Sequence, residues 1–163
     1  MSLGESMRLI KVFVGLFALI FASTALPAAA QTVTASPASI MAALQKAGLP
    51  TKLTAPEGGL TFIQSTSASG ADFAVFLLNC DNGRNCTTVQ FYAGFPNNTA
   101  TFSALNQWNT DNRFARAYIS EKGAARLEMD VDLDAGGMSS ALFADNLSVW
   151  LAVLAKYRTA FAK

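Results

Sequence analysis

The strongest constraint on the fold is a pair of apolar segments separated by a turn with a cysteine at each end. Residues 73–78 form a continuous apolar run, which suits a strand that is buried on both faces. Residues 87–95 alternate between apolar and polar side chains and predict a second strand. Between them, Cys80 and Cys86 enclose five turn-forming residues. This pattern predicts an antiparallel hairpin in the sheet of this protein.

The N-terminal thirty residues have the pattern of a secretory signal peptide. Arg8 and Lys11 form a basic start, residues 12–22 carry no charge, and three alanines stand at 28–30. We predict cleavage before Gln31 and a periplasmic or secreted mature chain, which would contact the membrane only transiently through this peptide. An uncleaved anchor is the alternative, because the whole uncharged stretch approaches the ~20 residues that a membrane helix needs.

Export would place the two cysteines in an oxidising compartment. Their C-x₅-C spacing differs from the C-x-x-C of redox motifs, so we predict a disulfide between Cys80 and Cys86, with a redox switch as the alternative. If these two residues face each other, the same register places Val75 opposite Phe91 on the core face of the sheet.

The remaining pattern predicts the element order α-βββ-α-ββ-α. Strand pairs joined by hairpins, with helices before, between and after them, indicate an α+β fold with an antiparallel sheet and packed helices. We expect residues 31–38 to form a linker and residues 39–163 to form the α+β domain. The expected strands are residues 60–63, 73–78, 87–95, 114–120 and 125–133. The expected helices begin near Ser36, at Thr99 or Thr101, and near Ser139.

The composition excludes several kinds of chemistry. The 163 residues include no histidine and two cysteines, which removes histidine-based catalytic triads, histidine metal sites and Cys₄ metal centres. The net charge of +1 predicts no basic surface for nucleic acid. We therefore expect no cofactor, no nucleic-acid partner and no enzymatic activity.

Four carboxylates alternate with apolar residues in the last predicted strand. The strand period places Glu128, Asp130, Asp132 and Asp134 on one face, and we interpret this as a solvated face. A divalent-cation site at Asp130, Asp132 and Asp134 is the alternative, because the spacing imitates the start of an EF-hand loop. That match fails at the sixth position, where Ala135 replaces glycine. A catalytic acid/base pair is the third interpretation, although the sequence marks no nucleophile beside it.

A polar segment around Trp108 is a candidate site for a small ligand. Asn106 and Asn109 flank this tryptophan, and amides beside an aromatic ring can line a pocket. The same residues can instead cap a helix end and satisfy turns.

The last predicted helix has an apolar arc of about 200°, which is wider than one core-facing stripe requires. Either the whole arc is buried in the core, or one side is buried and the other is offered to a partner, which includes a second copy of the chain as a homodimer. The candidate partner-binding residues are Leu142, Val149, Trp150, Val153 and Tyr157.

Ordered pieces between Gln90 and Trp150 resemble the YbjN family. The matching pieces are residues 91–95 (FYAGF), 106–109 (NQWN), 113–118 (RFARAY), 127–133 (LEMDVDL) and 136–139 (GGMS), followed by the aromatic-rich last helix. The family is described as candidate bacterial sensory transduction regulators, and its fold looks like that of type III secretion chaperones. Those are small α+β proteins, often dimeric, that bind other proteins without catalysis. The resemblance implies a regulatory, chaperone-like module with no catalytic residues to carry over.

These patterns together predict an exported, non-enzymatic protein-binding module that binds through its sheet or its last helix. Its protein partner is not identified by the sequence. A sensor of a small ligand or a divalent cation, using the Asn/Trp segment and the acidic strand, is the alternative.

Overall fold

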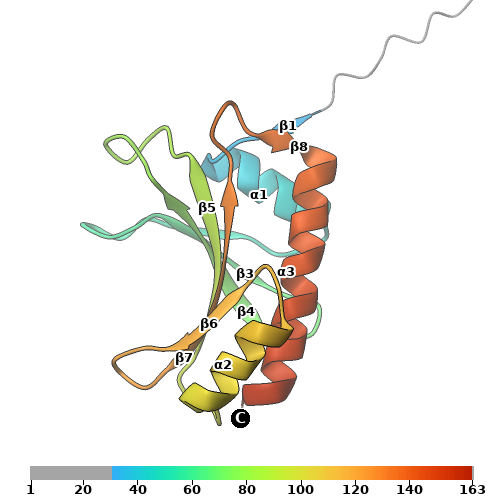
Figure 1. Ribbon diagram of the computed structural model, residues 1–163. Coiled ribbons are helices and arrows are strands. Elements are labelled where there is room, and N and C mark those ends of the chain that lie inside the picture. The colour runs from blue at the N-terminus through green and yellow to red at the C-terminus, as the bar shows by residue number, and fades with distance from the viewer. Residues whose placement is uncertain (1–30, 163) are drawn as a thin grey trace, which may run out of the picture.

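The computed structural model describes residues 31–162 (Figure 1). The predicted signal peptide, residues 1–30, lies outside the described residues. The strands are β1 (Thr32–Val33), β2 (Lys52–Thr54), β3 (Phe62–Thr66), β4 (Asp72–Leu78), β5 (Thr88–Phe95), β6 (Arg116–Ile119), β7 (Ala125–Asp132) and β8 (Met138–Ser139). The helices are α1 (Pro37–Lys46), α2 (Phe102–Asp111) and α3 (Ser140–Phe161). The predicted α+β class is confirmed.

The main sheet has six antiparallel strands in the order β2-β3-β4-β5-β7-β6. The register between β4 and β5 pairs Val75 with Phe91 and Leu77 with Val89, as the cysteine spacing predicts. Every pairing in this sheet joins two residues of the same numerical parity. Odd-numbered residues therefore share one face of the whole sheet, and even-numbered residues share the other.

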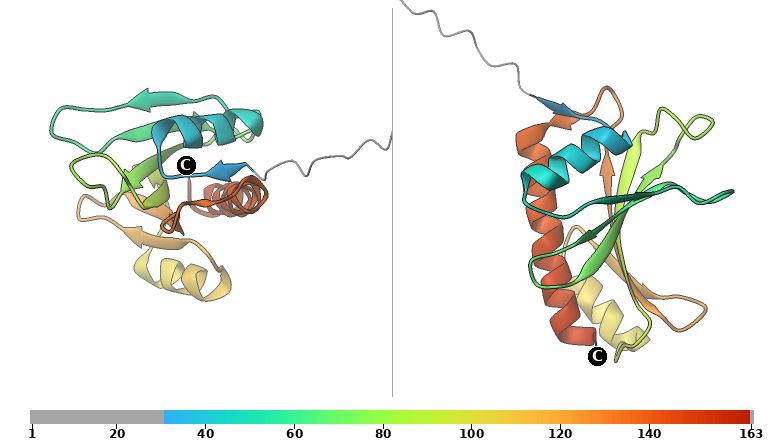
Figure 2. Two further views of the ribbon diagram at one scale, coloured as in Figure 1. Left: turned by 90° about the horizontal axis from the view of Figure 1, so that it is seen from above. Right: turned by 180° about the vertical axis from the view of Figure 1, so that it is seen from behind.

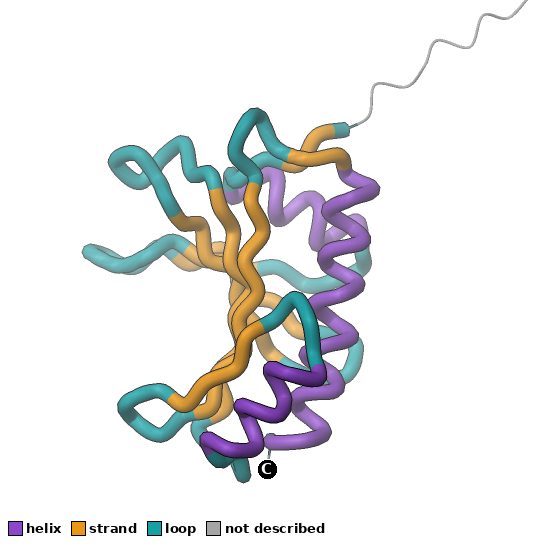
Figure 3. Tube along the Cα trace, in the orientation of Figure 1, coloured by secondary structure: helices purple, strands orange, loops and turns teal. Residues whose placement is uncertain are grey.

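The helices cover the odd-numbered face. Figure 2 shows α1 and α3 on the same side of the sheet, and Figure 3 shows the strands curving away from them. Phe91 of β5 is fully buried and packs on Phe143 and Trp150 of α3, with ring centroids 6.2 and 5.6 Å apart. α2 packs beside the C-terminal half of α3, where Trp108 meets Tyr157 edge-on at 5.1 Å. Burial of these large rings contributes strongly to the driving force for folding.

Each helix begins at a hydroxyl side chain. Ser36, Thr101 and Ser139 each accept a hydrogen bond from a backbone N–H in the first turn of α1, α2 and α3, respectively. Such caps satisfy backbone donors that have no partner within the helix. The predicted helix starts at Ser36 and Ser139 are confirmed, and of the two caps predicted for the second helix, Thr99 and Thr101, the helix uses Thr101.

Residues 31–38 differ from the predicted linker. Thr32 and Val33 form β1, which pairs with β8 immediately before α3, and α1 already begins at Pro37. The strand is only two residues long, so its sequence carries no periodic signal. Gly137 makes the pairing possible, because a Cβ at this residue would overlap the carbonyl oxygen of Val33.

Two further expectations are wrong. β4 is buried on one face only, and its even-numbered residues Ala74, Phe76 and Leu78 remain half-buried on the other. β2 has no counterpart among the predicted strands, because a strand of three residues is too short to show the alternation of apolar and polar side chains. Among residues 31–162, no helix combines the length and hydropathy that crossing a bilayer requires.

Candidate functional site

The candidate site is the even-numbered face of the main sheet, which no described helix covers. Figure 1 shows the β4–β5 and β6–β7 hairpins projecting away from the helices at the two ends of this face. The open face is therefore concave, with its centre on β4, β5 and β7. We call this surface the open sheet face.

Three aromatic rings form a line across the middle of the open sheet face. The Phe62 and Phe76 ring centroids lie 5.2 Å apart, and Phe76 meets Tyr92 edge-on at 5.5 Å. The three residues come from adjacent strands, β3, β4 and β5. Sheet pairing aligns them, and cross-strand aromatic contacts of this kind stabilise a sheet by up to ~1 kcal/mol each. All three side chains remain partly accessible to solvent.

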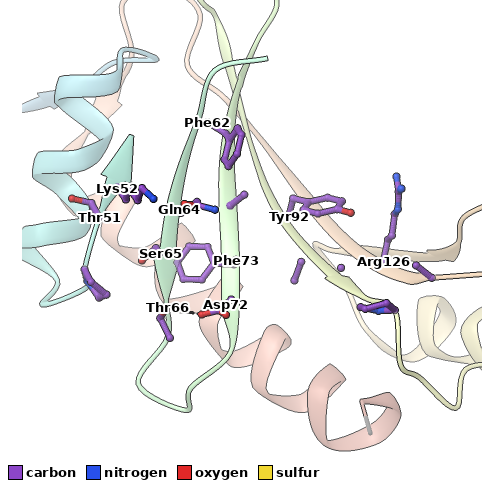
Figure 4. Close-up of a pocket in the computed structure, with 16 residues that line it drawn as sticks. Thr51, Lys52, Phe62, Gln64, Ser65, Thr66, Asp72, Phe73, Tyr92 and Arg126 are labelled. Carbon is purple, nitrogen blue, oxygen red and sulfur yellow. Dashed lines mark hydrogen bonds between the residues drawn. The ribbon is translucent and has the colours of Figure 1, made fainter. Parts of the chain in front are cut away.

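A hollow of about 670 Å³ lies beside this aromatic line. Figure 4 shows Lys52 at one side of the hollow, Phe62 in the middle, and Tyr92 and Arg126 at the other side. The apolar rings and the separated polar groups have the composition of a binding surface. The lining residues are Pro50, Thr51, Lys52, Phe62, Gln64, Ser65, Thr66, Asp72, Phe73, Ala74, Tyr92, Ala93, Gly94, Pro96, Ala124 and Arg126.

Gly94 creates space for Tyr92 and Arg126 to approach each other. Gly94 on β5 pairs with Arg126 on β7, and a Cβ at Gly94 would lie 2.9 Å from the Tyr92 hydroxyl oxygen. The tyrosine ring therefore lies over the bare glycine backbone. The Arg126 guanidinium is 5.7 Å from the centroid of Tyr92 and 5.9 Å from that of Tyr118. Cation–π attraction holds the arginine between the two rings.

Glu128 is buried next to this arginine and makes three hydrogen bonds. Arg116 donates to one carboxylate oxygen from Nε at 3.0 Å and from Nη2 at 2.7 Å. The Tyr118 hydroxyl donates to the other oxygen at 2.6 Å. The carboxylate raises the pKa of Arg116, and burial, followed by the hydrogen bond to Glu128, raises the pKa of Tyr118. The positive charge of Arg116 therefore compensates the Glu128 carboxylate, and both carboxylate oxygens have hydrogen-bond partners within the described residues.

The burial of Glu128 corrects the prediction of an entirely solvated acidic face. The strand period placed Glu128, Asp130 and Asp132 on one face correctly, but the Glu128 side chain is only 7% exposed. Arg116 lies directly opposite Glu128 on the neighbouring strand β6, so an ion pair compensates the loss of solvation.

The other acidic residues remain exposed and separate. Asp130 accepts a hydrogen bond from Gln90 at 2.8 Å, and Asp132 accepts one from the backbone N–H of Asp134. Asp134 lies beyond the end of β7. Within residues 31–162, no group of three or more His, Cys, Asp or Glu side chains gathers in a way that could hold a metal ion.

A protein-family model matches residues 36–163, and it describes YbjN as "Putative bacterial sensory transduction regulator". The chain belongs to the YbjN family. No curated protein matched the sequence. The match covers all of the main sheet and all three helices of this YbjN chain, so the open sheet face lies within the family region.

In this YbjN chain, the Asn/Trp segment lies on α2, away from the open sheet face. Trp108 is buried against Tyr157 and Phe161 of α3. Asn109 makes two hydrogen bonds to the backbone of Ala117 in β6. Its Nδ2 donates to the Ala117 carbonyl at 2.9 Å, and its Oδ1 accepts from the Ala117 N–H at 2.8 Å. Asn106 is exposed. These contacts give Trp108 and Asn109 structural roles.

The candidate partner residues on α3 divide into two groups. Trp150 and Tyr157 are completely buried in the core of this chain, so they cannot form an outward surface. Their spacing from Phe143 places them on the stripe that faces the sheet. Leu142 is exposed, and Val149 and Val153 are partly exposed. Only these three remain candidates for an α3 contact.

The disulfide between Cys80 and Cys86 is present. It closes the β4–β5 hairpin at the end of the sheet near α1, where a second hollow of about 590 Å³ lies. Leu60 at the edge of this hollow is more than half exposed.

The sequence interpretation missed the central residues of the open sheet face. Phe62, Phe76, Tyr92 and Arg126 all have even numbers. Phe76, Tyr92 and Arg126 each lie between two core residues of their strand, and Phe62 precedes the core residue Ile63. The register from the cysteine pair places Val75 and Phe91 on the core face, so strand alternation places their neighbours Phe76 and Tyr92 on the opposite face. That signal could have identified an aromatic surface, but it could not show that no helix covers it.

Proposed function

We propose that this chain is an exported, non-enzymatic regulatory module that binds another protein through its open sheet face. The observation that carries the proposal is the partly accessible aromatic line Phe62, Phe76 and Tyr92 on a sheet whose helices all pack on the other side. A sheet face that needs no partner usually carries polar side chains toward water.

The chemistry of the open sheet face fits a protein partner. Tyrosine, phenylalanine and arginine are enriched in the centres of protein–protein interfaces, and charged residues other than arginine are found more at the rim. Here Tyr92 lies toward the middle of β5 and Arg126 lies one row nearer the β6–β7 end, while Asp130 and Asp132 lie nearer the β4–β5 end. The hollow is wide and open, which suits a polypeptide segment better than an enclosed small molecule.

The non-enzymatic role is supported by the way the buried carboxylate is used. Within the described residues, Glu128 is the buried acidic side chain, and Arg116 and Tyr118 occupy both of its oxygens. A general acid or base needs a carboxylate that can exchange a proton with a substrate.

Export is supported by two independent features. The pattern of residues 8–30 is that of a signal peptide, and the Cys80–Cys86 bond requires an oxidising compartment to persist. A periplasmic module of this kind would hold its partner in a chaperone-like or sensory role.

A pair of lysine substitutions tests which surface binds. Phe76→Lys places a charge in the aromatic line, and Val149→Lys places the same charge on the outer side of α3. Each tagged protein is expressed in its native bacterium and purified in its mature form from the cell envelope. Proteins that co-purify with it are identified by mass spectrometry. Circular dichroism verifies that both variants fold.

We expect the Phe76→Lys variant to lose the protein that the wild-type chain retains, and the Val149→Lys variant to keep it. The reverse result would assign binding to the α3 surface of Leu142, Val149 and Val153. No specific protein retained by the wild-type chain would contradict the proposal itself.

A further inference from the structure

We infer that the segment bound at the open sheet face carries an acidic side chain that pairs with Arg126 and, two residues away, an apolar side chain that packs on the aromatic line. This inference rests on the proposed function and specifies the chemistry of its partner. It follows from the charges that line the hollow and from the spacing of its residues along the strands.

Arg126 is a cation without a carboxylate partner in the described part of the chain. Its one hydrogen bond is from Nη1 to the Tyr118 hydroxyl at 3.4 Å, and its Nε is buried without an acceptor. The ion pair found in residues 31–162 joins Arg116 to Glu128 instead. Arg126 therefore retains guanidinium donors of the kind that bind carboxylates in a bidentate arrangement.

The acidic groups around Arg126 are already engaged. Glu128, two residues along the same strand, accepts from Arg116 and Tyr118. Across Gly94, Asp72 of β4 accepts a hydrogen bond from Thr66 at 2.7 Å. Asp130, farther along β7, accepts one from Gln90.

The hollow itself is lined by two cations and one acid, namely Lys52, Arg126 and Asp72. Its net charge is complementary to an anion. Because the two cations lie on opposite sides of the hollow in Figure 4, a single small anion would not neutralise both. A segment that reaches across the hollow fits this arrangement better than a compact ion.

Arg126 is also held in place before any partner arrives. The ring centroids of Tyr92 and Tyr118 lie 5.7 and 5.9 Å from its guanidinium, and Gly94 opposite it leaves room for the Tyr92 ring to pack there. A fixed guanidinium loses little conformational entropy when it binds, which favours affinity.

The spacing along the strands sets the pattern of the partner. Arg126 and Gly94 form one row across the sheet, and Tyr92 with Ala74 lies in the next row on the same face. Successive rows on one face of a strand lie about 7 Å apart. An extended segment running along β5 has the same spacing between residues i and i+2. An acid at i and an apolar side chain at i+2 therefore reach Arg126 and the aromatic line together.

Two labelled peptides test the inference. One is a five-residue peptide with glutamate at its second position, leucine at its fourth and alanine elsewhere, and the other has glutamine in place of the glutamate. Fluorescence anisotropy at low salt measures their binding to the mature protein. The protein variants are Arg126→Gln and the control Arg113→Gln, which removes the same charge from an exposed loop before β6. Arg126→Met, which keeps an apolar stem between the tyrosines, replaces the first variant if that variant does not fold.

We expect the wild-type protein and the Arg113→Gln control to bind the glutamate peptide about tenfold more tightly than the glutamine peptide, and the Arg126 variant to lose this preference. Equal binding of the two peptides to the wild-type protein, including no binding of either, would overturn the inference. A preference that survives loss of Arg126 would overturn it as well.

A second measurement separates this inference from the proposed function. If the Arg126 variant retains the natural partner at the wild-type yield while the Phe76→Lys variant releases it, the open sheet face binds a protein but the acidic pairing is wrong. Release by both variants, with Arg113→Gln unaffected, supports both statements.

Discussion

The disulfide at the end of the β4–β5 hairpin gives a quantitative prediction. Replacing Cys80 and Cys86 by serine opens a loop whose ends are six residues apart in sequence. For a loop of this size, the loss of the chain-entropy constraint on the unfolded state amounts to about 2 kcal/mol. For a chain of this length, that loss lowers the melting temperature by about 6–10 °C.

The native hairpin is expected to survive the substitution. Thr87 donates a backbone hydrogen bond to Leu78 at 3.3 Å and accepts one from Leu133 at 2.7 Å. Arg84 closes the turn by donating to the carbonyl of Asp81 at 2.8 Å. These contacts do not depend on the sulfur atoms, so the variant should lose stability while keeping its fold.

Thermal unfolding followed by circular dichroism measures the effect, with and without a reducing agent. The reductant should lower the melting temperature of the wild-type protein to that of the double-serine variant and leave the variant unchanged. A wild-type melting temperature that does not respond to complete reduction, verified by thiol titration, would refute the reasoning.

Three further perturbations test the core, the N-terminal ribbon and the Glu128 network. Burial raises the pKa of Tyr157 to about 12, above its value near 10 in the unfolded chain. The free energy of unfolding should therefore be unchanged below pH 10 and fall by about 2–3 kcal/mol as the pH rises through 12. A Tyr157→Phe variant, compared with the wild-type protein by urea unfolding across this range, should lack that fall. Its hydroxyl has no hydrogen-bond partner in the described residues, so the variant should also be about 1 kcal/mol more stable at neutral pH, and a less stable variant would contradict this. Gly137→Ala should destabilise the protein by clearly more than the ~1–2 kcal/mol expected for its control Gly136→Ala. Both glycines have a positive φ, but only the substitution at Gly137 places a Cβ against Val33. Equal urea midpoints for the two variants would argue against the β1–β8 pairing. Glu128→Gln should cost about 1–3 kcal/mol in urea unfolding through loss of charge-assisted hydrogen bonds, whereas an unchanged midpoint would show that the buried network adds no stability.

Much of the fold could be predicted because the strong patterns are local. The alternation in β5 and β7 and the three-and-four spacing in α3 each give the buried face directly. The cysteine pair fixed the register of β4 on β5. The two-residue strands β1 and β8 could not be found in this way, because their pairing is set by contacts more than a hundred residues apart in sequence.

The candidate site was less predictable because it depends on what covers each face of the sheet. The residues of β4 are apolar on both faces. The sequence therefore does not distinguish a strand that is buried on both faces from one with an apolar face that is accessible to solvent. The acidic ladder shows the same limit, since only the opposing strand reveals that Glu128 meets Arg116. For Trp150 and Tyr157, the width of the apolar arc suggested exposure, but packing of α1, α2 and the sheet around α3 accounts for that width.

Site-specific photocrosslinking in the living cell tests the central claim most directly. A benzophenone amino acid replaces Phe76 on the open sheet face in one strain and Phe102, which is 78% exposed on α2, in another. Irradiation should join the chain to one discrete protein from Phe76 and to none from Phe102. Crosslinks of equal yield at the two positions, or a discrete product from Phe102 alone, would contradict binding through the open sheet face.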